Sequence, residues 1–232
     1  MLKAVLFDLD NTLVDRASAH RRYWQDFLLR FPRAVGGEPL SVSLEHLISE
    51  DELGYRDRGQ YFDFVAEILP GLQWDASDFW ADYRGRLASF VEPQPEMGRL
   101  ISCLAFKYKL AIVSNGSGGM QRNKLKRAHL ESFFSNIIIS SECEFEKPAA
   151  EIFGLALKRL GCKPEQVLFV GDDPVRDIQG AAQVGCRTCW ISLGRQFPGG
   201  LEKPDLHVST ACDLACALDL LPMCCQPFHH AC

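Results

Sequence analysis

The feature that most constrains the fold is a series of short apolar runs, rich in valine and isoleucine, that alternate with helix-length segments. Because these runs are apolar throughout rather than at every second position, they are typical of strands covered on both faces. Strands that alternate with helices predict an α/β fold with a doubly wound parallel sheet. The predicted strands are Ala4–Phe7, Leu110–Val113, Ile137–Ile139, Val167–Val170 and Thr188–Ile191, and helices are expected over Gly119–His129, Ala149–Leu160 and Pro174–Val184.

The stretch between the first two predicted strands breaks this rhythm. It contains no clear strand pattern, and prolines and glycines divide it into helical segments. These segments lie near Ser18–Phe31, Ser43–Ser49, Arg58–Leu69 and Ala76–Phe90. A proline-rich link at residues 92–95 marks the return to the sheet. The expected organisation is an α/β core of residues 1–15 and 92–232, with an all-helical cap of residues 16–91 inserted after the first strand.

Composition narrows the class of protein. The chain has 232 residues, of which 47% are hydrophobic and 24% charged, and its formal net charge is −5. Such an acidic chain lacks the basic face that binding to a nucleic-acid polymer requires. No apolar run approaches the length of a membrane span, and acids interrupt the apolar N-terminus, unlike in a signal peptide. We therefore expect a cytoplasmic monomer or homodimer whose partners include neither a nucleic-acid polymer nor a membrane.

The ten cysteines raise the question of a metal or redox site. Cys186 and Cys189 lie in a predicted strand, where residues three apart point to opposite faces and cannot easily share a metal. We expect both to be reduced, buried thiols. For the cysteines and histidines of the C-terminal tail, adventitious metal binding or oxidation is expected rather than a dedicated site. These residues are Cys224, Cys225, His229, His230 and Cys232.

Residues with active-site chemistry follow the predicted strands, beginning with the first. Asp8 and Asp10 come directly after it, and two carboxylates two residues apart at a strand end can point to the same side. One could attack a substrate while the other transfers protons, and the pair favours a bound cation. Taken alone, the two residues also suit a solvated turn, because Asp and Asn favour turns.

Two further groups suit the binding of a phosphate. Ser114, Asn115 and Gly116 follow the second strand and suit a loop whose backbone N–H groups cradle an anion, although an ordinary turn explains them as well. Lys147 precedes a predicted helix. There it could neutralise an acidic nucleophile and a phosphate, or it could be an exposed surface charge.

The last group follows the strand Val167–Val170. Asp172, Asp173 and Asp177 supply the oxygen ligands that Mg2+ prefers, although Asp173 before a proline also suits a helix N-cap. In open α/β sheets, ligands bind outside the carboxyl ends of the strands. Acids, a hydroxyl and a lysine at successive positions along this edge therefore indicate one site rather than four unrelated turns.

These four groups, in this order, resemble the motifs of the haloacid dehalogenase-like (HAD) superfamily. The matching motifs are Asp8-x-Asp10-x-Thr12, Ser114-Asn115-Gly116, Lys147-Pro148 and Gly171-Asp172-x4-Asp177. The resemblance covers nearly the whole chain, including the helical cap. Flanking segments are similar to the branch that contains N-acylneuraminate-9-phosphatase and the pyrimidine 5'-nucleotidases, among them Gln121-x3-Leu125 and Asp177-Ile178-Gln179-Gly180.

The resemblance implies a role for each motif residue. Asp8 would be the nucleophile and a Mg2+ ligand. Asp10 would be the general acid/base, with its main-chain carbonyl also on the metal. Asp172 would be a further metal ligand, and Lys147 would bridge Asp8 and the phosphate.

The remaining motif residues would bind the phosphoryl group or support the site. The Ser114 side chain and the backbone of Asn115 and Gly116 are implied to hold the transferring phosphoryl group. The residues implied to act from outside the set of ligands are Thr12, Asp173 and Asp177, and for Asp173 both a contact to the site and a helix cap stay open.

By the same resemblance, the chain would hydrolyse a small-molecule phosphate monoester with Mg2+ through an aspartyl-phosphate. Asp10 favours phosphate esters, because members that release a halide lack an acid at this position. The expected partner is a small phosphorylated metabolite, either a nucleoside monophosphate or a phosphorylated sugar or sugar acid. A sugar phosphomutase is the alternative enzyme, and a receiver-like module or a non-catalytic binding protein is the non-enzymatic alternative.

Two sets of residues outside the motifs are expected to be structural. The basic residues after the phosphate loop should form a solvated helix face, namely Arg122, Lys124, Lys126 and Arg127. The aromatic and arginine side chains of the cap could stack on a base or bind a carboxylate, but a cap core and a solvated face are the simpler interpretation. They include Tyr23, Trp24, Trp74, Trp80, Tyr83, Arg21, Arg22, Arg56 and Arg58.

Overall fold

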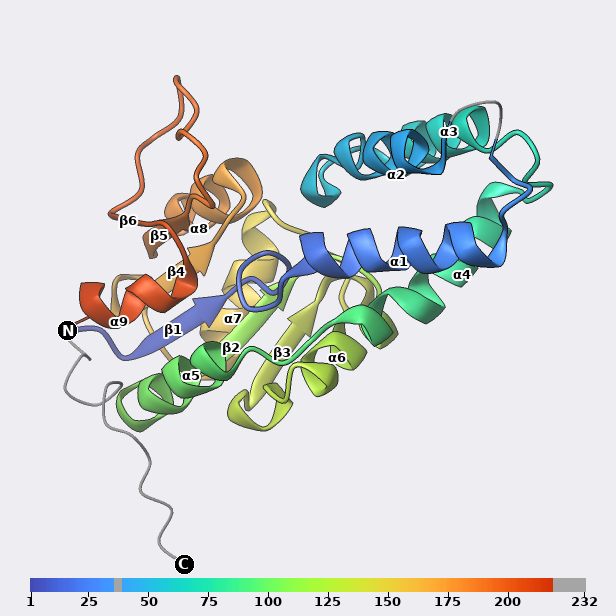
Figure 1. Ribbon diagram of the computed structural model, residues 1–232. Helices are drawn as coiled ribbons and strands as arrows, with labels where there is room; N and C mark the ends of the chain where they lie inside the picture. Colours follow the sequence, from blue (N-terminus) through green and yellow to red (C-terminus); the bar gives the residue numbers. More distant parts are fainter. Residues whose placement is uncertain (36–38, 219–232) are drawn as a thin grey trace, which may run out of the picture. The chain divides into compact units, whose positions relative to one another are not determined.

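The computed structural model describes residues 1–35 and 39–218. Its internal contacts divide the chain into two compact units, one of residues 1–14 and 93–232 and the other of residues 15–92 (Figure 1). The boundaries expected from the sequence differ from this division by one residue at each junction. The cysteines and histidines of the C-terminal tail, from Cys224 onward, lie outside the described residues.

The first unit is built on a six-stranded sheet in which every neighbouring pair of strands is parallel. The strands are β1 (Ala4–Phe7), β2 (Lys109–Ser114), β3 (Asn136–Ile139), β4 (Val167–Gly171), β5 (Arg187–Ile191) and β6 (Leu206–Val208), in the order β3-β2-β1-β4-β5-β6. The five predicted strands all form. The sequence did not predict β6, because this edge strand has only three residues and no continuous apolar run.

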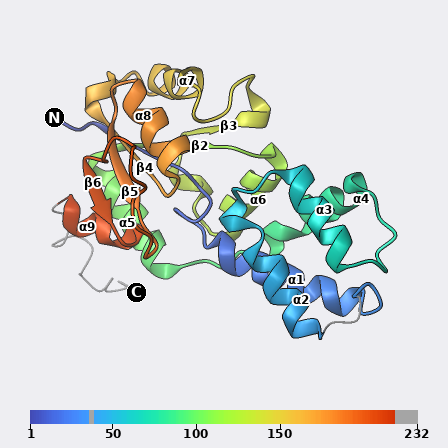
Figure 2. The ribbon, with the colours of Figure 1, turned by 90° about the horizontal axis from the view of Figure 1, so that it is seen from above.

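Helices cover both faces of the sheet, as the doubly wound pattern predicted. Alternate residues of each central strand point to opposite faces, and on one face they pack with α7 (Ala150–Leu160) and α8 (Gly180–Gln183). On the opposite side lie α5 (Pro95–Lys107) and α9 (Leu214–Ala217) (Figure 2). The buried cluster on the α7 side contains Leu6, Ala111, Val113, Ile152, Phe153, Phe169 and Ala181.

The sequence did not predict α5. The prolines near residue 95 indicated only a stiff link back to the sheet. Instead Pro95 is the first residue of α5, a position where its fixed φ suits a helix and its missing N–H costs no hydrogen bond. One apolar side of α5 is buried, with Met97, Leu100, Ile101 and Leu104 as the buried residues.

The order of the strands fixes where a site can form. From β1 the chain proceeds through β2 and β3 on one side, and from β4 through β5 and β6 on the other. The boundary between β1 and β4 is therefore the topological switch point, where open α/β sheets bind their ligands. The Asp8 N–H, just past the end of β1, donates to the Val170 carbonyl of β4 at 2.9 Å.

The second unit is all-helical, as expected. It comprises α1 (Arg16–Arg30), α2 (Leu40–Ser49), α3 (Arg58–Ile68) and α4 (Ala76–Arg86), with short 3-10 turns at Glu52–Gly54 and Leu87–Phe90. Asp15, Asp57 and Asp75 cap α1, α3 and α4 by accepting from backbone N–H groups of the first turn. Among the described residues, no helix is both long and apolar enough to cross a bilayer.

The core of the helical unit is aromatic and contains a buried ion pair. Trp24 stacks on Phe79 with ring centroids 5.7 Å apart. Arg16 donates to both carboxylate oxygens of Asp51, at 2.5 and 2.9 Å, and to the Tyr83 hydroxyl at 2.9 Å. Tyr23, Trp24 and Tyr83 are buried, as expected if the aromatic side chains of the cap form its core.

Candidate active site

The turn after β1 carries both acids of the first motif. Asp8 is buried directly beyond the strand. The chain then turns back, with the Leu13 and Val14 N–H groups donating to the Leu9 carbonyl at 2.9 and 3.0 Å. Asn11 adopts a left-handed φ of 57°, which asparagine tolerates better than most residues. Asp8 is thus fixed beside the sheet, whereas Asp10 lies on the turn.

Lys147 is buried among acids rather than exposed. Its side chain is 3% exposed, and its Nζ donates to Asp8 Oδ1 and to Asp177 Oδ1, each at 2.6 Å. A buried ammonium is costly unless it is paired and hydrogen-bonded, and here it meets two carboxylates. The alternative of an ordinary surface lysine therefore fails, and the lysine lies where an anionic nucleophile needs a cation.

Burial shifts the ionisation of this triad. It raises the pKa of Asp8 to about 7, against the opposing effect of Lys147, and it raises the pKa of Asp177 to about 6. Burial alone would lower the pKa of Lys147, but Asp177 and Asp8 outweigh it and raise that pKa above its ordinary value. The lysine is accordingly an ammonium at neutral pH, and burial makes both acids weaker than an exposed aspartic acid.

The phosphate-loop residues are tied to the lysine segment. Ser114 ends β2 and is buried. The Asn115 amide donates to the Lys147 carbonyl at 2.9 Å, and its oxygen accepts from the Lys147 N–H at 2.8 Å. The Gly116 N–H, expected to meet a phosphoryl oxygen, donates to Ser140 Oγ at 3.0 Å in this structure. Sequence reasoning gave Ser140 no role.

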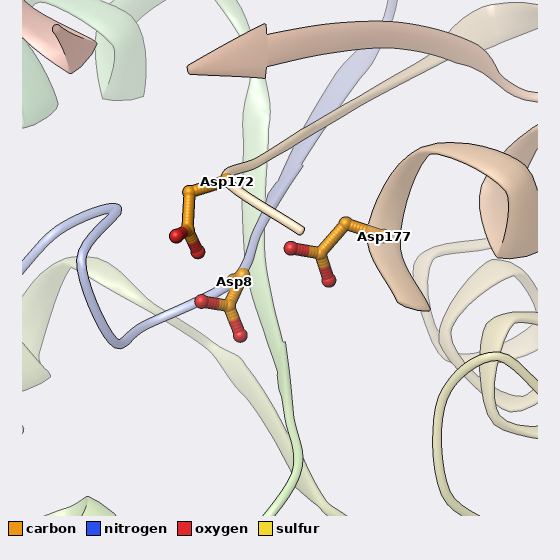
Figure 3. Close-up of side chains that lie close together, drawn as sticks. All are labelled: Asp8, Asp172 and Asp177. Atoms are coloured by element: carbon orange, nitrogen blue, oxygen red, sulfur yellow. The ribbon is translucent and has the colours of Figure 1, made fainter. Parts of the chain in front are cut away.

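The acids after β4 complete a cluster of carboxylates. Ligand oxygens of Asp8, Asp172 and Asp177 all lie within 4.8 Å of one another, and all three residues are buried. Figure 3 shows the three carboxyl groups converging from the ends of β1 and β4 and from the helical turn after β4. Asp177, expected to act from outside the set of ligands, is thus a member of the cluster.

The turn after β4 explains how Asp177 reaches the cluster. Residues Pro174–Gln179 form a wide π-type turn rather than the start of one regular helix, and such turns are frequent at functional sites. Asp173 caps this turn by accepting from the Val175 and Arg176 N–H groups at 2.8 and 2.9 Å. The structure thus shows the helix cap, and the Asp173 N–H also donates to Asp177 Oδ2 at 3.1 Å, while a contact of its side chain to a ligand stays a prediction.

The three acids fit a hard divalent cation. Carboxylate oxygens are the ligands that Mg2+ prefers, and part of this set is not occupied by Lys147, which bonds only Oδ1 of Asp8 and Asp177. Arg195, which the sequence did not single out, donates to Asp172 Oδ2 at 3.0 Å and to the Asp172 carbonyl at 2.8 Å. The metal contact expected of Asp10 is through its main-chain carbonyl and stays a prediction.

One neighbour of Asp10 lies where the sequence did not predict it. Lys124, expected on a solvated helix face, is buried on α6 (Gly118–Arg127), and its Nζ lies 2.6 and 2.8 Å from the two carboxylate oxygens of Asp10. Gln121 also donates to Asp10, at 3.0 Å. Lys126 and Arg127 are exposed as expected, and Arg122 forms an ion pair with Glu142. A lysine among other charged residues gives no sequence signal of burial.

Two further predictions concern Thr12 and the C-x-x-C pair. The Thr12 hydroxyl is buried without a hydrogen-bond partner among the described residues, so its supporting role stays a prediction. Cys186 and Cys189 are free, buried thiols, as expected. Burial raises the pKa of each to about 12, which keeps both protonated at neutral pH.

Comparison with known proteins decides the family. The model of the haloacid dehalogenase-like hydrolases matches residues 2–185. The chain belongs to this hydrolase family. The match confirms the resemblance drawn from the four motifs, and because the family is one of hydrolases, the receiver-module alternative is dropped.

Several proteins similar in sequence to this chain are named as phosphatases or as a nucleotidase. A glyceraldehyde 3-phosphate phosphatase of Pyrococcus abyssi is 30% identical over 84% of this chain and 83% of its own length. The pyrimidine 5'-nucleotidase YjjG of Escherichia coli is 33% identical over 90% of this chain and 95% of its own. The N-acylneuraminate-9-phosphatase of Homo sapiens is 25% identical over 94% of each chain. The chain is therefore a HAD-like phosphatase, from the branch that the flanking residues indicated.

Proposed function

We propose that this HAD-like phosphatase hydrolyses a small phosphate monoester with Mg2+, through a covalent phosphoryl intermediate on Asp8. The observation that carries the proposal is the buried contact of Lys147 with Asp8 and Asp177, at 2.6 Å each. An anionic nucleophile repels an anionic phosphate, and a fixed ammonium beside Asp8 offsets that repulsion. Phosphoryl transfer depends chiefly on such positioning and charge neutralisation.

The residues divide the reaction into two steps. A carboxylate oxygen of Asp8 bonds to phosphorus while the bond from phosphorus to the ester oxygen breaks, and Asp10 gives a proton to that leaving oxygen. Water then attacks the phosphorus while the bond between phosphorus and the Asp8 oxygen breaks, and Asp10 takes a proton from that water. The products are the alcohol of the ester and inorganic phosphate, and Asp8 and Asp10 return to their starting states.

A divalent cation would be held by Asp8 and Asp172, with Asp177 beside them in the same carboxylate cluster. When bound, Mg2+ supplies positive charge that stabilises the phosphoryl oxygens. Ser114, at the end of β2, would hold another phosphoryl oxygen through its hydroxyl. Lys147 would keep the nucleophile oriented by its contact to Asp8 Oδ1.

The names of the similar phosphatases indicate a substrate class. The three phosphatases compared above are named for a triose phosphate, for pyrimidine nucleotides and for a sugar acid phosphate. All are small phosphate monoesters. We infer that the substrate is of this kind, a nucleoside monophosphate or a phosphorylated sugar, sugar acid or related metabolite.

The test is a phosphate-release screen over phosphorylated metabolites, with Mg2+ and with a chelator. Each ester that the protein hydrolyses should release one equivalent of inorganic phosphate, and only when Mg2+ is present. Transfer of phosphate to another position of a sugar, without its release, would indicate a mutase instead. Asp8→Asn should abolish turnover, and Asp63→Asn, on the exposed side of α3, is the matched control. Sustained turnover by Asp8→Asn would rule out the covalent mechanism.

A further inference from the structure

Lys124 is a buried lysine that the proposed mechanism does not use. Its side chain is 1% exposed, and both of its described contacts with Asp10 are short, at 2.6 and 2.8 Å. A lysine so deeply buried destabilises a fold unless it has an anionic partner. Lys124 and Asp10 are 114 residues apart in sequence, so their pairing depends on how α6 packs beside the turn after β1.

Gln121 adds a second contact from the same helix. Residues three apart on a helix lie on one face, so Gln121 and Lys124 approach Asp10 together. The Gln121 amide donates to Asp10 Oδ2 at 3.0 Å and to Ser114 Oγ at 2.7 Å. This side chain therefore links the carboxylate proposed to transfer protons with the hydroxyl proposed to hold the phosphoryl group.

Lys124 and Gln121 together restrict the orientation of the Asp10 side chain. Unlike Asp8, whose N–H bonds to β4, Asp10 lies on a turn, and its side chain is 23% exposed. Lys124 contacts both carboxylate oxygens, and Gln121 contacts one of them. A carboxylate that accepts several hydrogen bonds at both oxygens has little rotational freedom.

We infer that Lys124 is a positioning residue for the proton transfer by Asp10, assisted by Gln121. The inference rests on the proposed function, because it assumes that Asp10 protonates the leaving oxygen. In this inference Lys124 acts through Asp10, which it contacts at both carboxylate oxygens. Loss of Lys124 should therefore impair the reaction most where the leaving oxygen needs a proton most.

The experiment compares two phosphate esters that differ in their leaving group. An alkyl phosphate from the screen needs protonation of its leaving oxygen, whereas p-nitrophenyl phosphate releases a stable anion. In Lys124→Met, kcat for the alkyl ester should fall by about 100-fold, the scale of general acid catalysis, and kcat for the aryl ester by much less. Lys124→Arg, which keeps the charge, should recover part of the loss. Lys126→Met, exposed on the same helix, is the matched control.

A double-mutant cycle gives a readout that does not depend on the ester. Asp10→Asn should lower the melting temperature, because it leaves a buried ammonium without its carboxylate, and adding Lys124→Met should restore part of it. When Asp10→Asn is already present, adding Lys124→Met should lower kcat for the alkyl ester only a little further. Additive effects in both assays would contradict the pairing.

The outcomes separate this inference from the function on which it rests. If the wild-type protein hydrolyses neither ester, the proposed function fails. If the wild type is active and Lys124→Met lowers kcat equally for both esters, Lys124 is only structural and the inference is wrong. Should Lys124→Met not fold, Lys124→Gln carries the same comparison, because it removes the charge beside Asp10 but keeps a polar side chain at this buried position. An equal loss on both esters in that variant overturns the inference too.

Discussion

The side-chain amide of Asn115 holds both main-chain polar groups of Lys147. Its Nδ2 donates to the Lys147 carbonyl at 2.9 Å, and its Oδ1 accepts from the Lys147 N–H at 2.8 Å. The contact joins residues 32 apart in sequence and ties the end of β2 to the segment that presents the lysine. Asn115 therefore positions the ammonium that faces Asp8, in addition to the phosphate contact that its backbone is expected to make.

Asn115→Ala should lower kcat strongly, because the backbone that carries Lys147 loses its anchor. A misplacement of a catalytic group by about 1 Å can cost 100-fold in rate. Leaving two backbone groups unpaired should also cost about 1–3 kcal/mol for each that stays buried. Steady-state kinetics and urea unfolding measure the two effects. Asn123→Ala, exposed on α6, should change neither, and wild-type kinetics in Asn115→Ala would contradict the anchoring role.

Gly171→Ala tests the packing of Asp177 against the end of β4. A Cβ at residue 171 would lie 2.5 Å from Asp177 Cγ, far inside van der Waals contact. Asp177 would have to move, and its contact with Lys147 would move with it. We expect both lower activity and a loss of about 1–3 kcal/mol in the free energy of unfolding, as for other overpacked sites.

The control for this change is Gly154→Ala in α7. A Cβ there meets no atom within 4 Å, and alanine favours a helix over glycine. That variant should keep full activity and gain slightly in stability. If Gly171→Ala behaved in the same way, Asp177 would not need its present position.

The Arg16–Asp51 pair should make the helical unit sensitive to acid. Burial alone would raise the pKa of Asp51, but Arg16 outweighs it and holds that pKa below its ordinary value. The pair therefore stabilises the fold above the ordinary aspartate pKa, about 3.9, and that stability is lost as the pH falls through the lower pKa of the folded state. Asp51→Asn should lose this contribution at pH 7 already, about 3–5 kcal/mol for a broken buried pair.

Chemical unfolding at pH 7 and at pH 3 measures this effect. The wild type should lose more stability between the two pH values than Asp51→Asn does. Glu45→Gln is the control, since Glu45 and Arg21 form an exposed pair on the same unit. Equal pH dependence in wild type and Asp51→Asn would show that the pair contributes nothing.

The buried thiols of Cys186 and Cys189 should react slowly. Their pKa of about 12 leaves almost no thiolate at neutral pH, and both side chains are shielded from solvent. Mass spectrometry after brief iodoacetamide treatment should find label on the exposed Cys216 before these two. In the protein unfolded by guanidinium, the three cysteines should be labelled at equal rates. Fast labelling of Cys186 and Cys189 in the native protein would revive a redox interpretation of the pair.

Much of the site was predictable from the order of residues along the chain. Parallel strands bring their carboxyl ends to one edge, so acids after β1 and β4 and a hydroxyl at the end of β2 had to come near one another. The same logic did not reach α5 or β6. The helix begins at a proline that indicated only a link, and the strand is too short to give a periodic signal.

The order of residues along the chain was enough to infer the parallel α/β core, the helical insertion and the residues proposed to carry the chemistry, because hydrophobic period and strand-end polarity are local properties. The pairings of these residues depend on how the fold packs. Lys147 meets Asp8 and Asp177, and Lys124 is buried against Asp10. A lysine is expected to be exposed unless it has a charged partner. Asp10 lies 114 residues from Lys124, and Asp8 and Asp177 lie 139 and 30 residues from Lys147, so only the packing of the fold could reveal these contacts.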